Sequence, residues 1–203
     1  MTPSAIASLD GKLHGGIDAY KAQLGGNGFT QLGAETIPPL VSRGVVLDLP
    51  AVLGAPVLQP GCEITPEDLA AAADGLDLES AAVILIRTDW ATHWADAATY
   101  VGTKNGVPGV GSAAAAWLAD RGVLATGTDI MAFDCIPAGA SHGNLPAHSL
   151  LLVDKGIYII ENLNLEALAE SGFQEFLFVL VPLPIVGGTD SPARPLAIVR
   201  ADG

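Results

Sequence analysis

The sequence has 203 residues, of which half are hydrophobic and 15% are charged, and its formal net charge is −13. These proportions exclude a disordered chain, which combines low hydrophobicity with high net charge, and they predict one domain of ordinary size. Nine basic residues spread along the chain form no cluster. This excludes an extended phosphate-binding surface for nucleic acid and a docking surface for an anionic membrane.

Membrane insertion and secretion are not indicated either. No apolar run approaches the ~20 residues that span a bilayer, and the opening segment MTPSAIASLDGK lacks the basic start and apolar run of a signal peptide. Cys62 and Cys135 lie far apart in the sequence and are expected to be buried or half-buried thiols rather than a disulfide. We therefore expect a cytoplasmic location.

The first half of the chain begins irregularly. Residues 1–40 are rich in Gly and polar residues without a regular period, and predict mostly loop with one short helix. Apolar runs over 43–49 and 82–88 are typical of buried strands. Between them, Thr65 followed by Pro66, Glu67 and Asp68 predicts the start of a helix that stops near Gly75.

The second half alternates helices and strands. Ser112 is the expected N-cap of a helix that Gly122 ends, and a short helix is predicted over 163–170. Further strands are predicted at 123–128, 157–160, 174–183 and 195–199. Apolar strands alternating with helices predict an α/β fold, in which residues 1–203 form a single layered domain with a mostly buried, mixed sheet.

Three residues are candidates for metal chemistry. Asp129 and Glu161 each follow a predicted strand, where ligands of α/β proteins gather, and His148 offers an imidazole. One histidine and one carboxylate are half of a divalent metal site, whereas a capped or salt-bridged structural role is the alternative. The sequence contains no nucleophile elbow, phosphate-binding loop or H-E-x-x-H motif.

Several segments, in a consistent order from about residue 11 to 200, resemble the cyclase family of metal-dependent hydrolases, which includes kynurenine formamidase and isatin hydrolase. VILIRTDW resembles a strand followed by Arg-Thr-Gly-Trp, with Asp89 where Gly is usual. The other similar segments are RGVVLDLP, GSAAAAWLADRGVLATGTDIMAFD, PAHSLLLVDKGIYIIENLNLEAL and LVPLPIVGGTDSPARPLAIV.

The resemblance implies the swivelling β/β/α fold of kynurenine formamidase. It also implies hydrolysis of small amides, lactams, lactones or esters with a divalent metal, zinc or manganese. An arylformamidase in tryptophan catabolism to kynurenine is one such enzyme. His148 and Glu161 match family positions that bind a second metal, and Asp129 matches a pocket residue. The family resemblance further implies a homo-oligomer, a dimer or a tetramer, with a small-molecule substrate.

The family's main metal motif, H-x-G-T-H-x-D-x-x-x-H, is absent from the place where it is expected, just before Asp10. We therefore expect an N-terminally truncated relative whose chain alone binds metal poorly and has little hydrolase activity. A non-catalytic relative that acts as a binding or structural protein is one alternative. The other is an active site rebuilt with His14, Asp18 or His93, of which His14 and Asp18 are the possible replacement ligands.

An aromatic loop is a candidate wall of the substrate pocket. Trp90, His93 and Trp94 follow a predicted strand, as does Asp129, and together they are the expected substrate-pocket residues. Core packing is the alternative for Trp90. His142 is expected to be a solvated loop residue.

Overall fold

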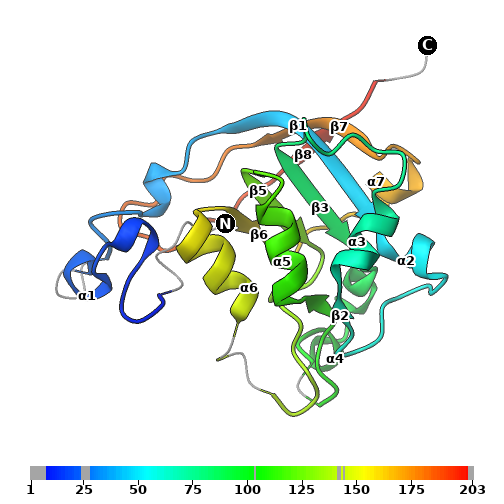
Figure 1. The fold of residues 1–203 in the computed structure, drawn as a ribbon, viewed down its shortest axis with the longest axis horizontal. Helices are drawn as coiled ribbons and strands as arrows, with labels where there is room; N and C mark the ends of the chain where they lie inside the picture. Colours follow the sequence, from blue (N-terminus) through cyan, green and yellow to red (C-terminus); the bar gives the residue numbers. More distant parts are fainter. Residues whose placement is uncertain (1–7, 24–27, 103, 141–142, 144, 201–203) are drawn as a thin grey trace.

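The computed structural model describes residues 8–23, 28–102, 104–140, 143 and 145–200. Its centre is a six-stranded sheet with the spatial order β6-β5-β3-β1-β7-β8 (Figure 1). The strands are β1 (Leu40–Asp48), β3 (Val83–Arg87), β5 (Ala125–Thr128), β6 (Tyr158–Ile160), β7 (Glu175–Leu180) and β8 (Leu196–Ile198). All six strands expected from the sequence are present.

The sheet is mixed, as predicted. β1, β3, β5 and β6 run parallel to one another, whereas β7 is antiparallel to β1 and β8 is antiparallel to β7. The parallel strands are mainly apolar, and most of their side chains are buried on either face of the sheet. The four parallel carboxyl ends therefore meet at one edge, which is where the polar residues described below gather.

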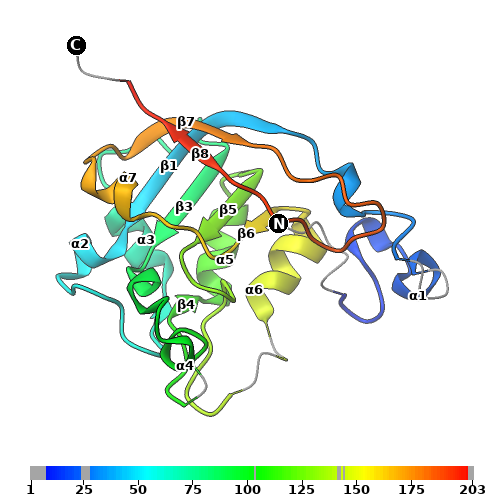
Figure 2. The ribbon, with the colours of Figure 1, turned by 180° about the vertical axis from the view of Figure 1, so that it is seen from behind.

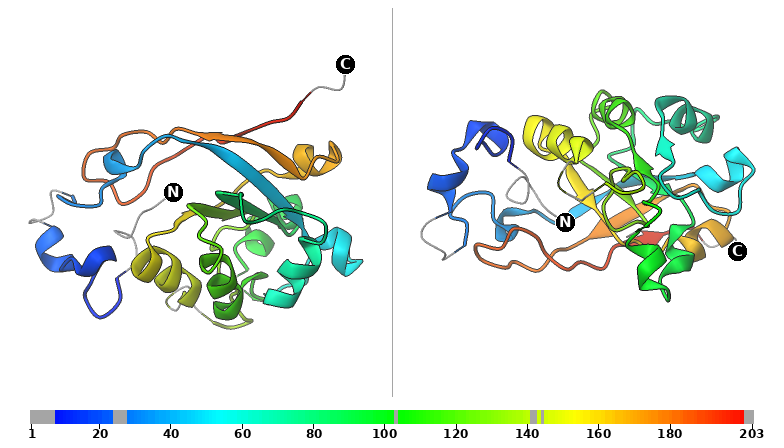
Figure 3. Two further views of the ribbon diagram at one scale, coloured as in Figure 1. Left: turned by 45° about the horizontal axis from the view of Figure 1, so that its top comes forward. Right: turned by 90° about the horizontal axis from the view of Figure 1, so that it is seen from below.

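Helices cover one face of the parallel strands, and the left view of Figure 3 shows them as a separate layer below the sheet. The main cluster of buried residues lies between this layer and side chains such as Val45, Leu47, Ile84 and Ile86. The helices of the layer are α2 (Leu49–Leu53), α3 (Pro66–Ala72), α5 (Ser112–Ala119) and α6 (Pro146–His148), which continues into a π-helical turn, Ser149–Lys155.

The opposite face has a smaller apolar cluster and much less cover. Figure 2, from behind, shows the strands and the β7–β8 segment in front, with only α7 (Glu166–Glu170) at the side. Leu85, Ile160, Phe176 and Phe178 form this cluster together with residues of the segment that follows β6. This uneven cover leaves room for a pocket on this face.

Residues 8–23 and 28–39 precede the first strand of the sheet. They contain only short elements: a 3-10 turn at His14–Gly16, α1 (Ala19–Ala22) and a second 3-10 turn at Ala34–Thr36. This part packs against the long β7–β8 connection, where the Glu35 carboxylate accepts a hydrogen bond of 3.0 Å from the Gly187 amide.

The helix beginnings were predicted with mixed success. Thr65 caps α3 in a full capping box with Asp68. The expected N-cap at Ser112 is wrong, because Gly111 occupies that position and makes no side-chain bond, while Ser112 is already helical. No sequence pattern indicated α2, α6 with its π-helical turn, or a small parallel pair, β2 (Glu63–Ile64) and β4 (Gly109–Val110).

Membrane-spanning helices and a disulfide were both not expected from the sequence. Among the described residues, no helix is long and apolar enough to cross a membrane. Cys62 and Cys135 are free, half-buried thiols, as predicted.

Candidate active site at the carboxyl ends of the strands

Charged and polar residues end each of the four parallel strands. Asp48 ends β1, Arg87 ends β3, Asp129 follows β5 and Glu161 follows β6. Because these strands are parallel, all four residues lie at the same edge of the sheet. This edge is where α/β proteins bind their ligands.

His148 lies at this edge between two carboxylates. Its Nδ1 is 2.6 Å from Asp134 Oδ2, and its Nε2 is 3.3 Å from Glu161 Oε1. Asp134 is fully buried and also accepts hydrogen bonds from the main-chain amides of Ala147 and His148, at 2.6 and 3.2 Å. Asp134 therefore fixes both the start of α6 and the orientation of the imidazole.

The electrostatics of His148 follow from this arrangement. Burial lowers the pKa of His148, but the hydrogen bonds to Asp134 and Glu161 outweigh burial and raise it to about 9. Nδ1 donates to Asp134, so a neutral imidazole would present its Nε2 lone pair to the Glu161 carboxylate. Two lone pairs facing each other repel, so either a proton or a cation is needed between Nε2 and Glu161.

Asp129 is held by the neighbouring strand. Its carboxylate accepts hydrogen bonds from the Thr88 amide at 3.0 Å and from the Thr88 hydroxyl at 2.6 Å. Burial raises the pKa of Asp129, and the Thr88 bonds oppose that rise. Beside it, the buried Thr128 hydroxyl has no hydrogen-bond partner among the described residues. This end of β5 therefore holds a buried acid and a hydroxyl that is able to bind a further group.

Arg87 organises a second polar group on the same edge. Its guanidinium lies 2.9 Å from Asp48, 2.6 Å from Asp89 and 2.6 Å from Glu166. Burial, followed by a hydrogen bond with Glu166, raises the pKa of Asp89 to about 6, and Arg87 opposes that rise. One cation for three carboxylates explains why one of them holds its proton more tightly than usual.

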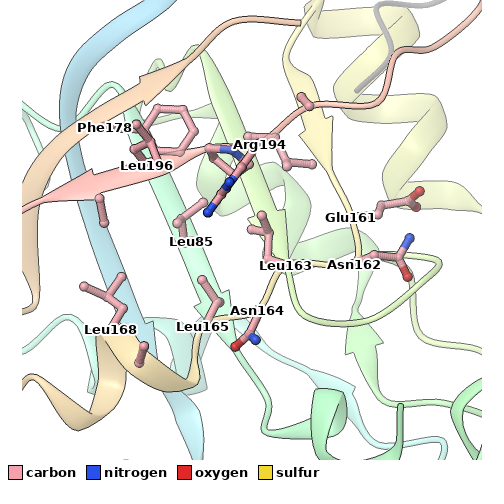
Figure 4. A pocket seen from close by; sticks show the side chains of 15 residues that line it. Leu85, Glu161, Asn162, Leu163, Asn164, Leu165, Leu168, Phe178, Arg194 and Leu196 are labelled. Carbon is pink, nitrogen blue, oxygen red and sulfur yellow. The ribbon is translucent and has the colours of Figure 1, made fainter. Parts of the chain in front are cut away.

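A pocket of about 530 Å³ lies on the sparsely covered face of the sheet, with Glu161 in its wall (Figure 4). Leu85, Leu163 and Phe178 give the pocket an apolar lining, and Arg194 extends into it from the segment before β8. The volume and the mainly apolar lining are typical of small-molecule sites. Glu161 therefore connects His148 to a space that can hold an organic substrate.

The structure places the aromatic loop away from this pocket. Trp90 is fully buried, and its indole N–H donates to the Tyr100 carbonyl at 3.0 Å. The ring of His93 packs on Trp90 and that of Trp94 on Tyr100. Trp90 lines a separate cavity of about 200 Å³. None of Trp90, His93, Trp94 and Asp129 lines the pocket that contains Glu161.

The two possible replacement ligands have structural partners of their own. His14 Nδ1 donates to the Val153 carbonyl at 2.8 Å. Asp18 caps α1 by accepting from the Lys21 amide at 3.0 Å, and it pairs with Lys12 at 3.4 Å. These contacts do not join either residue to His148. His142 lies outside the described residues.

The donor set fits a divalent metal only in part. Within the described ranges no group of three or more His, Cys, Asp or Glu side chains has the geometry of a metal site. His148 nevertheless has the usual pattern of a metal-binding histidine, in which a carboxylate accepts from one ring nitrogen while the other can face the ion. His148 Nε2 and Glu161 are therefore two donors, fewer than the three protein ligands of a typical catalytic zinc site.

Four residues that form the hydrogen bonds and ion pairs of this edge were not identified from the sequence: Thr88, Arg87, Asp134 and Glu166. Thr88 and Arg87 carried a usable signal, because they end a predicted strand just as Asp129 and Glu161 follow theirs. Asp134 and Glu166 lie in irregular or helical segments, and no local pattern indicates that they face the sheet edge.

Residues 10–135, more than half of the chain, match the family model of the cyclases ("Putative cyclase"). The chain belongs to the cyclase family. The resemblance recognised in the sequence is thereby confirmed, as is the mixed α/β fold with a helix layer on the central sheet.

Two curated relatives of this cyclase-family chain have named activities. It is 30% identical to isatin hydrolase of Roseibium aggregatum over 119 residues, which are 57% of this chain and 44% of that protein. It is also 30% identical to kynurenine formamidase of Bordetella petrii over 183 residues, 87% of this chain and 71% of that protein. The match therefore spans less than half the length of the first relative.

Solved structures agree with the fold. A crystal structure described as a novel cyclase matches with a TM-score of 0.84 and 28% identity, covering 98% of this chain and 68% of that one. A second structure, described as a potential metal-dependent hydrolase with cyclase activity, matches with a TM-score of 0.53 and 26% identity, covering 79% and 66% of the two chains.

Proposed function

We propose that this cyclase-family chain acts on small amides, lactams, lactones or esters as a metal-dependent hydrolase. The observation that carries the proposal is the position of Glu161. Its carboxylate contacts His148 Nε2 at 3.3 Å and also forms part of the wall of an apolar pocket of about 530 Å³. A carboxylate that could bind a metal thus borders a space of substrate size. The named activities of the two relatives, isatin hydrolase and kynurenine formamidase, support a carbonyl substrate with an aromatic group.

The chain's own residues have separate parts in this proposal. Asp134 holds the His148 ring in one orientation, and Glu161 places its carboxylate at the pocket wall beside His148 Nε2. The apolar side chains around Leu85 and Phe178 exclude water from the substrate's ring. His148 and Glu161 are the donors that would hold zinc or manganese, and a bound metal would polarise the carbonyl and acidify a water.

Only two donors would bind the metal weakly, so we expect turnover to require metal in large excess over the protein. The test is hydrolysis of isatin and of an N-formyl arylamine by the purified chain, with and without added zinc or manganese. Glu161→Gln should lower kcat/KM by about 100-fold. Glu170→Gln, an exposed carboxyl change on α7, is the matched control and should leave turnover unchanged.

A second function is favoured by the small donor set. With two donors, the chain can be a non-catalytic relative whose pocket only binds small molecules. Folded protein that shows no turnover of either substrate at any metal concentration would overturn the hydrolase proposal and support the binding protein.

A further inference from the structure

Arg194 is the cationic side chain of the pocket that contains Glu161. Among the described residues, the lining of this pocket has two charged side chains, Glu161 and Arg194, and two neutral amides, Asn162 and Asn164. The other lining residues are apolar. Glu161 follows β6 whereas Arg194 precedes β8, and Figure 4 shows the two side chains apart from each other. A ligand in this pocket therefore meets one charge of each sign at separate places.

The guanidinium of Arg194 has no partner within the described part of the chain. It forms no ion pair or hydrogen bond there, whereas Arg43 pairs with Glu175 at 3.0 Å and Arg87 binds three carboxylates. The sequence has 22 acidic residues and only nine basic ones, so carboxylate partners are plentiful. An arginine that is unpaired in such an acidic chain keeps all five of its N–H donors available for a ligand.

The backbone around Arg194 is stiff. Pro192 and Pro195 flank the arginine closely, and each proline fixes its own φ and holds the preceding residue in an extended conformation. Directly after Pro195, Leu196 pairs with Val179 of β7. The segment that carries the guanidinium is thus anchored to the sheet. A group presented from a stiff segment loses less conformational entropy when it binds a ligand.

A purely structural role is the alternative for Arg194. Long charged side chains cover apolar surface with their methylene groups while the charged end stays in water, and Arg194 is an exposed residue beside apolar side chains. The two roles differ in one measurable property. An arginine that only covers apolar surface is indifferent to the charge of a ligand, whereas a free guanidinium pairs with a carboxylate through two parallel hydrogen bonds.

We propose that Arg194 binds an anionic group of the ligand and thereby selects small aromatic molecules that carry a carboxylate. The inference rests on the proposed function, in which this pocket holds the substrate, and it concerns the part of the substrate that does not react. The reacting carbonyl lies at Glu161, the ring lies on the apolar lining around Leu85 and Phe178, and the carboxylate lies at Arg194. Because Glu161 repels a carboxylate, the two opposite charges also fix the orientation of the ligand.

Isothermal titration calorimetry on the full chain tests the proposal with two probes that share one ring, indole-3-acetate and its neutral amide, indole-3-acetamide. A chelator in all samples prevents a metal from binding the carboxylate. The wild type should bind the acetate about tenfold more tightly than the amide, the effect of one hydrogen-bonded charge pair. Arg194→Gln should remove this preference, and Arg194→Lys should retain only part of it, because an ammonium cannot bind a carboxylate through a planar fork.

The matched control is Arg200→Gln, which makes the same change in net charge at an exposed arginine that does not line the pocket. It should bind both probes as the wild type does. Circular dichroism must show that all variants are folded. Wild-type protein that binds both probes equally, or neither, would refute the role of Arg194. So would an equal loss of preference in Arg200→Gln, because the effect would then come from the net charge.

Hydrolysis separates this inference from the proposed function. With metal added, the ratio of kcat/KM for N-formyl-3-aminobenzoate to that for N-formylaniline should fall about tenfold in Arg194→Gln, through KM rather than kcat. Carboxylate-selective binding without turnover of either compound would remove the hydrolase and keep the role of Arg194. Turnover of both compounds with equal kcat/KM by the wild type would keep the hydrolase and remove the role of Arg194.

Discussion

At the scale of single residues, Asp89 combines an unusual backbone with an unusual charge environment. Its φ of 64° is in the left-handed region, which favours glycine, and Asp tolerates it better than most residues. The Asp89 carboxylate lies 2.6 Å from the Arg87 guanidinium and shares a hydrogen bond with Glu166. A position whose backbone favours glycine therefore carries an acid at the sheet edge.

Asp89 should make stability depend on pH between about 4 and 6. Its pKa is raised from 3.8 to about 6, so in this range the folded state holds more proton than the unfolded state. The contribution of Asp89 to stability is therefore complete below about pH 4 and is lost as the pH rises through 6. Asp89→Asn keeps the left-handed backbone and removes this loss. Urea unfolding of both proteins across this range measures the difference.

The matched control for Asp89→Asn is Asp154→Asn, at an exposed carboxyl of the π-helical turn. The free energy of unfolding of Asp89→Asn, relative to the wild type, should rise with pH, whereas that of Asp154→Asn should not. A constant difference between Asp89→Asn and the wild type from pH 4 to 6.5 would contradict the role given to Asp89.

At the scale of elements, the small β2–β4 pair connects to the candidate site through Gly109. A Cβ at Gly109 would overlap the main chain of Asp134 and Cys135. Asp134 in turn orients His148 and the start of α6. The close approach of β4 to this segment therefore needs glycine, and it links a minor sheet to the position of the imidazole.

Gly109→Ala should lower the free energy of unfolding by about 2 kcal/mol, because backbone atoms must move to make room. Gly122→Ala is an instructive comparison. Its Cβ would meet nothing within 4 Å, but its φ of 67° is left-handed, so its cost of roughly 1 kcal/mol is conformational alone. Urea unfolding of both variants gives the two values. A smaller loss for Gly109→Ala than for Gly122→Ala would show that the close approach is unimportant.

Predictability also differed among the elements. The start of α3 was recognisable because Thr65 and Asp68 form their capping box within four residues of sequence. The helical conformation around His148 was not recognisable, because the segment combines one short helical turn with a π-helical turn, and neither has a regular apolar period. Its conformation depends on Asp134, which precedes His148 by 14 residues and binds its main chain.

At the scale of the whole molecule, the net charge of −13 is a source of instability. The acidic side chains repel one another in the compact state. Raising sodium chloride from about 20 to about 200 mM shortens the screening distance and should therefore raise the midpoint of thermal unfolding by a few degrees. A chelator in all samples removes any contribution from bound metal. A midpoint that falls with salt would mean that ion pairs such as those of Arg87 outweigh the repulsion.

The sequence by itself determined the six strands and the family. It also indicated Asp129, His148 and Glu161 as candidate site residues, because strand apolarity and strand-end residues are local features. The tertiary structure alone decided which of these residues meet. His148 and Glu161 are brought together with Asp134, which no sequence pattern indicated, whereas Trp90 is turned into the core. It also decided that the helix layer covers Val45 and Leu47 of β1 but leaves Val41 exposed, since cover depends on how far packed helices reach rather than on any one strand.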